Sequence, residues 1–395
     1  MGLIVAVDGS PAWRALRLLL AAAAALAVAA LERRLTGRPR GLPSLVVGVV
    51  AGTAGATIGF SYLFRAGMSL KALGGLIAFA GGLAAIVFGT TSLLRPVRGW
   101  RRLLAVPVAL VIALAAVRPQ YGAVYATNVP RPQIGSDTPA DHRLDYENAS
   151  FETSDGVLLS GWYVPSSNGA AVVLLHGASS TRSNVLAHAV VFARNGYGVL
   201  AFDARGHGRS EGRAMEFGWY GELDTAAAVD YLSSRADVDP GRIGVVGMSM
   251  GGEEAIGAMA ADSRIKAVIA EGATNRVLED RGWLVEEFGV RGRIQQMVNS
   301  VEFALVDLLT EAPEPPPLRE AVKAAAPRPV LLIAAGRVPD EQHAGRSIHA
   351  GSPETVSMWV VEPSGHTGGL RTQPEEWEKR VMEFLIDGLP AAGVR

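Results

Sequence analysis

One serine, set among small residues, is the first feature of this chain that could do chemistry. Ser249 lies in the hexapeptide GMSMGG, residues 247–252, directly after an apolar run and directly before a stretch of helical pattern. A nucleophile on a tight strand-to-helix turn needs almost no side chain two residues before it and two residues after it. Gly247 and Gly251 meet that need, so the pattern predicts a nucleophile elbow that exposes the hydroxyl of Ser249.

A serine hydroxyl becomes nucleophilic when a base takes its proton. His366 follows the last predicted strand in the glycine-flanked loop EPSGHTGGL, which can bring its ring over the serine. A carboxylate that orients this histidine is expected after the preceding strand, where Asp340 and Glu341 are adjacent. Asp340 is preferred because aspartate is the commoner acid, Glu341 is the alternative, and Glu271, after an earlier strand, is an outside candidate.

The oxyanion of an acyl-transfer reaction needs backbone N–H donors fixed in advance. The N–H of Met250 is one expected donor, and Gly177 or Ala178, in the turn after the run VVLLHG, supplies the other. His176 is expected to shape that turn. The chain has no cysteine, and its histidines lack ligand spacing, so neither a metal nor a cofactor is predicted.

The elements that must position these residues begin near residue 146. SFETSDGVLLSGWYVP predicts a hairpin, and short apolar runs then alternate with helical patterns such as GELDTAAAVDYLSSR. This alternation predicts an α/β domain with a mainly parallel sheet flanked by helices. The carboxyl ends of such strands share one edge, where His176, Asp203, Ser249 and the later candidates would gather.

Four features together resemble the α/β-hydrolase superfamily: HG at a strand end, DARGHGRS, GMSMGG and the late GH. The resemblance covers residues 146–390 and is greatest to the bacterial serine-hydrolase branch, which is serine aminopeptidase-like or dienelactone-hydrolase-like. It implies an α/β-hydrolase fold with a short helical lid near 275–326. Such proteins often read G-x-x-D after the acid strand, whereas residues 336–340 are one residue longer, which leaves the acid open.

The first 118 residues have a different texture, with four apolar runs near 15–31, 42–64, 70–94 and 103–117. A bilayer-spanning helix needs about 20 predominantly apolar residues, which the second and third runs meet easily. The sequence therefore predicts an N-terminal bundle of about four transmembrane helices, with a buried bundle in a soluble protein as the alternative. Residues 119–145, which are rich in proline, are expected to form an extended linker.

Arginines predict the orientation of the expected bundle. The loops after the first and third runs are rich in arginine, which favours their placement in the cytoplasm. The domain that follows would then lie outside the cytoplasm, anchored to the plasma membrane.

The balance of charged residues helps to exclude one class of partner. The 37 Lys and Arg nearly balance the 38 Asp and Glu, which argues against nucleic acid as a partner. The preferred hypothesis is a membrane-anchored serine hydrolase that cleaves a carboxylic ester through an acyl-enzyme, with a small-molecule or lipid-like acyl substrate. A peptidase, amidase or thioesterase with the same triad is the alternative, and a membrane-anchored binding module is the non-enzymatic one. The oligomeric state stays open.

Overall fold

The structure is a computed structural model that describes residues 41–97 and 116–390, with isolated positions at 23, 27, 30, 31, 34, 99 and 107. The chain divides into two compact units. The first comprises Met1–Pro130 and Met297–Thr310, and the second comprises Arg131–Gln296 and Glu311–Arg395. We call the first the N-terminal unit and the second the sheet domain, and describe each by itself.

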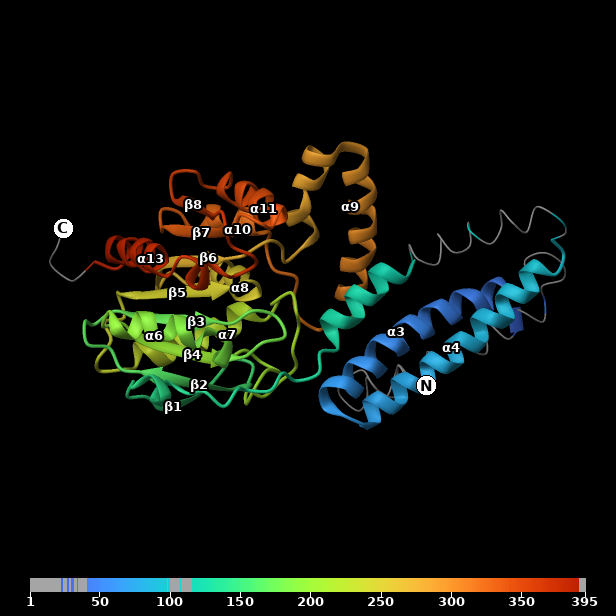
Figure 1. Cartoon of the computed structure of the whole chain (residues 1–395), viewed down its shortest axis with the longest axis horizontal. Coiled ribbons are helices and arrows are strands. Elements are labelled where there is room, and N and C mark those ends of the chain that lie inside the picture. The colour runs from blue at the N-terminus through green and yellow to red at the C-terminus, as the bar shows by residue number, and fades with distance from the viewer. Residues whose placement is uncertain are drawn as a thin grey trace. The chain divides into compact units, whose positions relative to one another are not determined.

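An eight-stranded sheet with the order β1-β2-β4-β3-β5-β6-β7-β8 forms the sheet domain (Figure 1). Strands β1 and β2 form the expected antiparallel hairpin, β2 pairs antiparallel with β4, and all later pairs are parallel. The strands are β1 Glu147–Glu152, β2 Leu158–Val164, β3 Ala171–Leu175, β4 Gly198–Asp203, β5 Ile243–Met248, β6 Ile265–Glu271, β7 Val330–Ala335 and β8 Val356–Val361.

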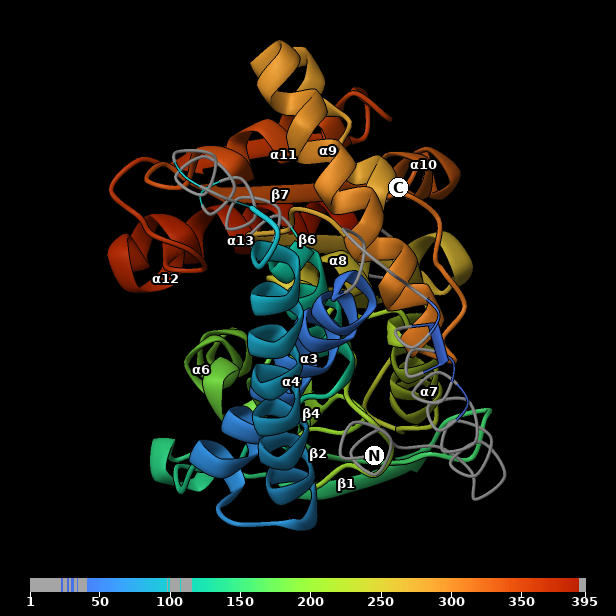
Figure 2. The same cartoon turned by 90° about the vertical axis from the view of Figure 1, so that its right-hand side faces the viewer.

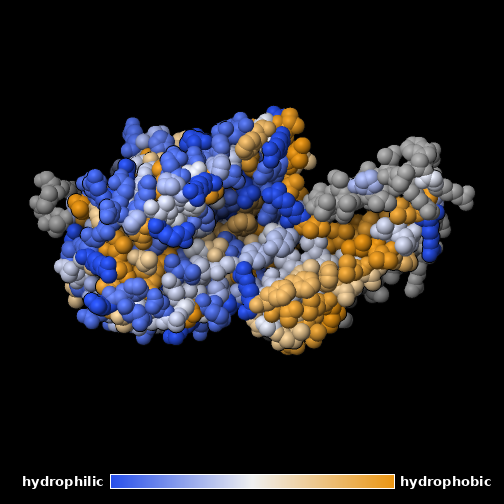
Figure 3. Space-filling view, viewed as in Figure 1, coloured by the Kyte–Doolittle hydropathy of each residue, from blue (hydrophilic) through white to orange (hydrophobic). Residues whose placement is uncertain are grey.

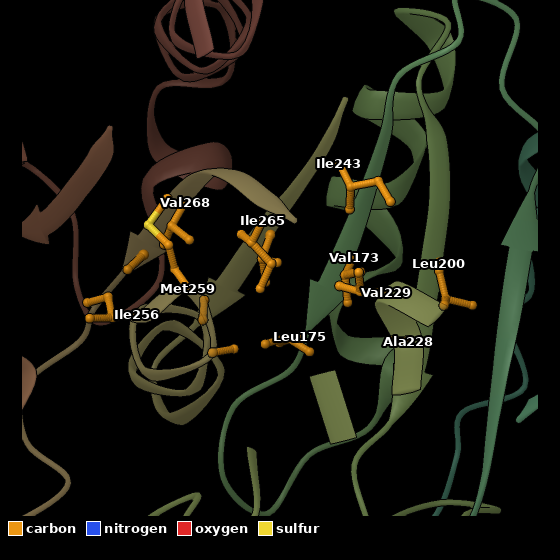
Figure 4. Close-up of a cluster of buried hydrophobic side chains, with 14 of the residues drawn as sticks. Val173, Leu175, Leu200, Ala228, Val229, Ile243, Ile256, Met259, Ile265 and Val268 are labelled. Atoms are coloured by element: carbon orange, nitrogen blue, oxygen red, sulfur yellow. The ribbon is translucent and has the colours of Figure 1, made fainter. Parts of the chain in front are cut away.

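Helices cover both faces of this sheet because its central strands are apolar throughout and must be buried on both sides. Residues of α7, α8 and α10 pack with one face in a single core cluster, part of which Figure 4 shows. Residues of α6 and α13 pack on the other face. The helices of the domain are α6 Leu186–Arg194, α7 Gly221–Ser233, α8 Met250–Ala261, α10 Leu318–Ala325, α11 Pro339–His349, α12 Gly369–Thr372 and α13 Pro374–Gly388, with short 3-10 turns at Pro139–His142, Arg182–Val185 and Leu278–Arg281.

Two long apolar helices, α3 (Leu42–Ala66) and α4 (Leu70–Leu94), lie side by side in the N-terminal unit (Figures 1 and 2). Their backbones touch because glycines face each other, and a Cβ added at Gly82 would come within 2.4 Å of the amide nitrogen of Gly52. Apolar side chains gather over this pair in Figure 3. Among the described residues, these are the two helices long and apolar enough to cross a membrane, by length and composition.

Of the four expected spans, two fall on residues that the structure describes. The runs near 42–64 and 70–94 correspond to α3 and α4. The runs near 15–31 and 103–117 lie almost entirely outside the described residues. By length and composition alone, α3 and α4 fit membrane spans, but the core helix of a soluble protein and a signal sequence pass the same test.

The predicted linker was wrong over its first part, because residues 116–127 are helical. Ala123, Val124 and Thr127 are buried, and Val124 packs with Ala54 and Ile58 of α3. That spacing of three and four residues is the apolar period of a helix face, which the nearby prolines masked in the sequence. Beyond residue 127 the chain is irregular up to β1, apart from the first 3-10 turn.

The expected lid region contains α9 (Trp283–Leu309), α10 and a 3-10 turn. Gly289 interrupts α9 with non-helical backbone angles, φ 52° and ψ −122°, so a regular helix runs from residue 290 to 309. At its first turn Trp283 is buried and stacks on His343 of α11, with 5.1 Å between the ring centroids. The lid function of this region stays a prediction.

Candidate active site

Ser249 lies between the end of β5 and the first residue of α8, with φ 55° and ψ −122°. Residues with a side chain rarely adopt these angles, so the serine occupies a strained turn. A Cβ at Gly247 would lie 2.0 Å from the carbonyl oxygen of Gly251, and one at Gly251 would lie 2.7 Å from that of His176. The small residues around Ser249 thus leave room for backbone on both sides of the turn.

A hydrogen-bonded chain of three side chains starts at this serine. The hydroxyl oxygen of Ser249 lies 2.9 Å from Nε2 of His366. On the other side of the ring, Nδ1 of His366 lies 2.6 Å from Oε1 of Glu341. The second carboxylate oxygen, Oε2, accepts the backbone N–H of Ala335 at 2.8 Å, and Glu341 is buried. Both oxygens are therefore held, and the carboxylate fixes the orientation of the ring.

Glu341, the alternative acid, occupies the position for which Asp340 was preferred. Asp340 is exposed in the first turn of α11, which begins at Pro339, and its carboxylate is not in contact with His366. Successive residues of a helix point about 100° apart, so only one of two neighbours can face the histidine. In the first turn of α11 residue 341 is the buried position, so Glu341 faces His366.

The contact with Glu341 raises the pKa of His366 above its ordinary value of 6.5, chiefly through the hydrogen bond between the ring and the carboxylate. Burial opposes this effect by disfavouring the charged ring. The arrangement can stabilise an imidazolium at His366. It suits His366 to act as a general base and then as a general acid.

The turn after β3 lies directly against the serine. A Cβ at Gly177 would lie 3.2 Å from Cβ of Ser249. The next residues are fixed by Glu216, since the backbone N–H and the hydroxyl of Ser179 both donate to its Oε1, at 3.1 and 2.9 Å. Gly177 and Ala178 are therefore held beside Ser249, as is Met250 at the start of α8. Their N–H groups as oxyanion donors remain a prediction.

His176 and His207 are buried behind this turn, with their ring centroids 4.9 Å apart. Burial lowers the pKa of His176 to about 4 and that of His207 to about 3. His176 accepts the N–H of Ala204 on Nε2, so its proton is on Nδ1, which donates to the carbonyl of Gly177. Both rings are neutral and serve to shape the turn.

Glu271, the outside candidate for the acid, binds groups that follow His366 in the chain. Its Oε1 accepts the N–H of Gly369 at 2.7 Å, and its Oε2 accepts the indole N–H of Trp377 at 2.9 Å. These groups follow His366 in the chain, so the buried carboxylate anchors the loop that carries the histidine. Burial raises the pKa of Glu271. No local sequence pattern indicates the partners of Glu271 or the role of Glu216, because each contact joins residues far apart in the chain.

Asp203, another strand-end carboxylate, is structural. It is fully buried, accepts the N–H groups of Arg182 and Arg209, each at 2.9 Å, and lies 3.5 Å from the guanidinium of Arg182. Within the part of the chain that the structure describes, no three His, Asp or Glu side chains form a group that could hold a metal ion.

Comparison with known proteins agrees with this architecture. Residues 166–298 match the family described as serine aminopeptidase, S33. The uncharacterized protein Rv2307c of Mycobacterium tuberculosis is 35% identical over 168 residues, which are 40% of this chain and 57% of that protein. Thiohydrolase aneE of Aspergillus aculeatus is 36% identical over 134 residues, which are 32% of this chain and 41% of that protein. The chain thus spans less than two thirds of either relative.

Among solved structures, the esterase Pf2001 of Pyrococcus furiosus is similar to this chain with a TM-score of 0.52 and 27% sequence identity. The similarity covers 66% of this chain and 97% of the esterase. The matched family region contains β5, the strained turn at Ser249 and α8. On the strand order, this family match and this likeness, the chain belongs to the α/β-hydrolase superfamily.

Proposed function

We propose that this chain is a serine hydrolase that cleaves a carboxylic ester, with Ser249, His366 and Glu341 as its catalytic triad. The observation that carries the proposal is the unbroken hydrogen-bonded chain from the Ser249 hydroxyl through His366 to Glu341. His366 takes the hydroxyl proton while the serine oxygen attacks the ester carbonyl. The protonated ring then gives the proton to the leaving alcohol, and water releases the acyl group by the same steps.

The choice of an ester is supported by the likeness to the Pyrococcus furiosus esterase. A thioesterase is the second candidate, supported by the partial match to thiohydrolase aneE, and a peptidase or amidase is the third, supported by the family description. All three use the same nucleophile and oxyanion donors and differ in the leaving group. A binding module that uses the fold without catalysis remains the non-enzymatic alternative.

The proposal includes membrane anchoring through α3 and α4, the two helices that are long and apolar enough to span a bilayer. The proposed anchor lies in the plasma membrane. The arginine-rich flanks of the apolar runs favour an orientation with the sheet domain outside the cytoplasm. Protease protection of the sheet domain in intact cells and in inverted vesicles tests this orientation.

The experiment that tests the chemistry is fluorophosphonate labelling of the full chain in detergent, beside Ser249→Ala. Turnover of p-nitrophenyl esters, an acyl thioester and an aminoacyl anilide is measured in parallel. We expect labelling and ester turnover to vanish together in the variant, with a loss of about 10⁴-fold or more in kcat. A folded wild-type chain that neither labels nor turns over any of these substrates would favour the binding module.

A further inference from the structure

The helix from residue 290 to 309 has an apolar stripe on the side that the fold leaves open. Its members are strongly exposed: Val290 74%, Ile294 60%, Met297 70%, Val301 50% and Leu308 74%. Ala304, which is also exposed, fills the one gap in the spacing. At about 100° per residue these positions fall within an arc of about 80°. Figure 3 shows orange side chains along α9.

The opposite side of the same helix is the one that the fold buries. Asn299, Phe303 and Val306 have exposures of 0%, 4% and 0%. The apolar stripe is therefore not the core-facing side of an ordinary surface helix, which would be covered. Soluble monomers rarely expose a contiguous apolar surface of this kind unless something binds there.

Charges flank the stripe along its length. Arg291 and Arg293 stand on either side of its first turn, and Glu302 and Asp307 stand on either side of its last two turns. Charges at this frequency are too costly for a helix that crosses the hydrocarbon core. They suit a helix that lies along a membrane surface, with its apolar stripe in the acyl region and its flanks among the headgroups.

The end of the stripe points to lipid as the occupant. Leu309, next to Leu308, packs against the cluster of Ala54, Ile58 and Val124, and two of these residues belong to α3. Residues Met297–Thr310 form one compact unit with α3 and α4. If α3 spans a bilayer, the part of the helix that belongs to this unit, residues 297–309, reaches the same bilayer.

We propose that residues 297–309 of this helix are interfacial and that the part of the stripe they carry, Met297, Val301, Ala304 and Leu308, contacts membrane lipid. The inference rests on the proposed membrane anchoring and not on the proposed hydrolase chemistry. A second copy of this chain is the competing occupant, because the stripe also has the three-and-four spacing of a coiled-coil seam.

The test uses single cysteines, because the natural chain has none. Met297→Cys and Val301→Cys probe the stripe, and Asp307→Cys, on the exposed flank of the same helix, is the matched control. Val87→Cys on α4, where the side chain is 62% exposed, is the membrane reference. Each full-length variant carries an environment-sensitive fluorophore in phosphatidylcholine–phosphatidylglycerol nanodiscs, with and without nitroxide-labelled lipid as quencher.

We expect the lipid quencher to act several-fold more strongly at positions 297 and 301 than at 307, and nearly as strongly as at 87. Quenching at 87 together with equal, weak quenching at 297, 301 and 307 would overturn the inference and leave the anchoring intact. Self-quenching between copies at 297 and 301, without lipid quenching, would assign the stripe to a dimer and also overturn it. Without quenching at 87, the anchoring and the inference both fall.

Fluorophosphonate labelling of Ser249 in the same nanodiscs reports separately on the hydrolase site. Labelling that persists while lipid quenching fails shows that only the membrane contact is wrong. Quenching that persists while labelling fails shows the reverse.

Discussion

Glycine lets two backbone segments approach closely in both compact units, but the number and the spacing of these close approaches differ between the units. In the sheet domain the close approach is confined to one turn, where Gly247 and Gly251 make room around Ser249. In the N-terminal unit it recurs along a whole helix, at Gly48, Gly52, Gly55 and Gly59 of α3, facing glycines of α4. A side chain added at the single turn would concentrate all of its distortion there. Between α3 and α4 the same distortion can be spread over several similar contacts. The same substitution should therefore act differently in the two units.

The largest effect is expected from Gly247→Ala. Its Cβ would lie 2.0 Å from the carbonyl oxygen of Gly251, and neither backbone segment can move without dismantling the turn. We expect more than about 4 kcal/mol of destabilisation and no labelling at Ser249. Scanning calorimetry and fluorophosphonate labelling measure the two effects. Gly241→Ala, where the nearest atom is a side-chain oxygen of Asp239 at 3.2 Å, is the control and should be nearly neutral.

The next largest effect concerns Glu341, the carboxylate that holds His366 beside Ser249. Glu341→Gln should lower kcat/KM by about 10³–10⁴-fold, because the ring of His366 loses its fixed tautomer and its counter-charge. Asp340→Asn, the matched control one residue away, should change kcat/KM less than about twofold. Equal losses in the two variants would contradict the assignment of Glu341.

The pH dependence follows from the raised pKa of His366. The base must be neutral, so kcat/KM of the wild type should rise with pH through a value above 6.5. Glu341→Gln removes the main cause of the shift, and this limb should move to lower pH. Because the pKa is raised, the contact stabilises the folded state most below pH 6.5, and this contribution is lost as pH rises through the folded-state pKa. Catalysis therefore requires the neutral ring of His366, whereas the contact with Glu341 stabilises the folded state most when the ring is protonated.

A smaller and graded effect is expected in the helix pair. Gly82→Ala places a Cβ 2.4 Å from the amide nitrogen of Gly52, but the two helices can separate slightly along their length. We expect a loss of about 1–3 kcal/mol, with Ser249 labelling retained. The neighbouring Gly81 has open space around its Cβ position, so Gly81→Ala should stabilise by up to about 1 kcal/mol. Thermal unfolding of the full chain in detergent compares the pair, and identical shifts would refute the packing account.

The smallest effect, a modest loss of kcat, is expected from Glu271→Gln. An amide can accept one of the two hydrogen bonds from Gly369 and Trp377 but not both with the same geometry. The loop of His366 loosens, and we expect kcat to fall about tenfold with KM unchanged. The acid limb should shift in the same direction as for Glu341→Gln, but less. Glu375→Gln, at an exposed position in the first turn of α13, is the control. A tenfold rise in KM alone would show that Glu271 acts on substrate binding instead.

Sequence patterns predicted the sheet domain well because its strands are short apolar runs that end at chemically distinctive residues. Ser249 and His366 were found because they follow such runs and are flanked by glycine. The choice between Asp340 and Glu341 depends on which residue in the first turn of α11 faces His366, and no local sequence pattern shows this. The anchoring role of Glu271 and the hold of Glu216 on Ser179 arise only from the fold.

The N-terminal unit was harder to predict because apolar composition indicates how long a helix is but not which of its faces is buried. The runs that became α3 and α4 were long enough to stand out. The helix over 116–127 was missed, because Pro119 and the mixture of alanine and tyrosine give a weak apolar period. The stripe on α9 was hidden for a related reason. Both sides of that helix are apolar, and only the fold shows which one is covered.

One pair of backbone angles recurs in the chain with opposite consequences. Gly289, at the interruption of α9, has φ 52° and ψ −122°, and Ser249 has φ 55° and ψ −122°. Glycine adopts these angles freely, whereas in serine they cost on the order of 1–3 kcal/mol of conformational free energy. Ser249→Gly would relieve that strain and remove the hydroxyl in the same step. At position 249 the stability of the turn and the presence of a nucleophile are therefore opposed.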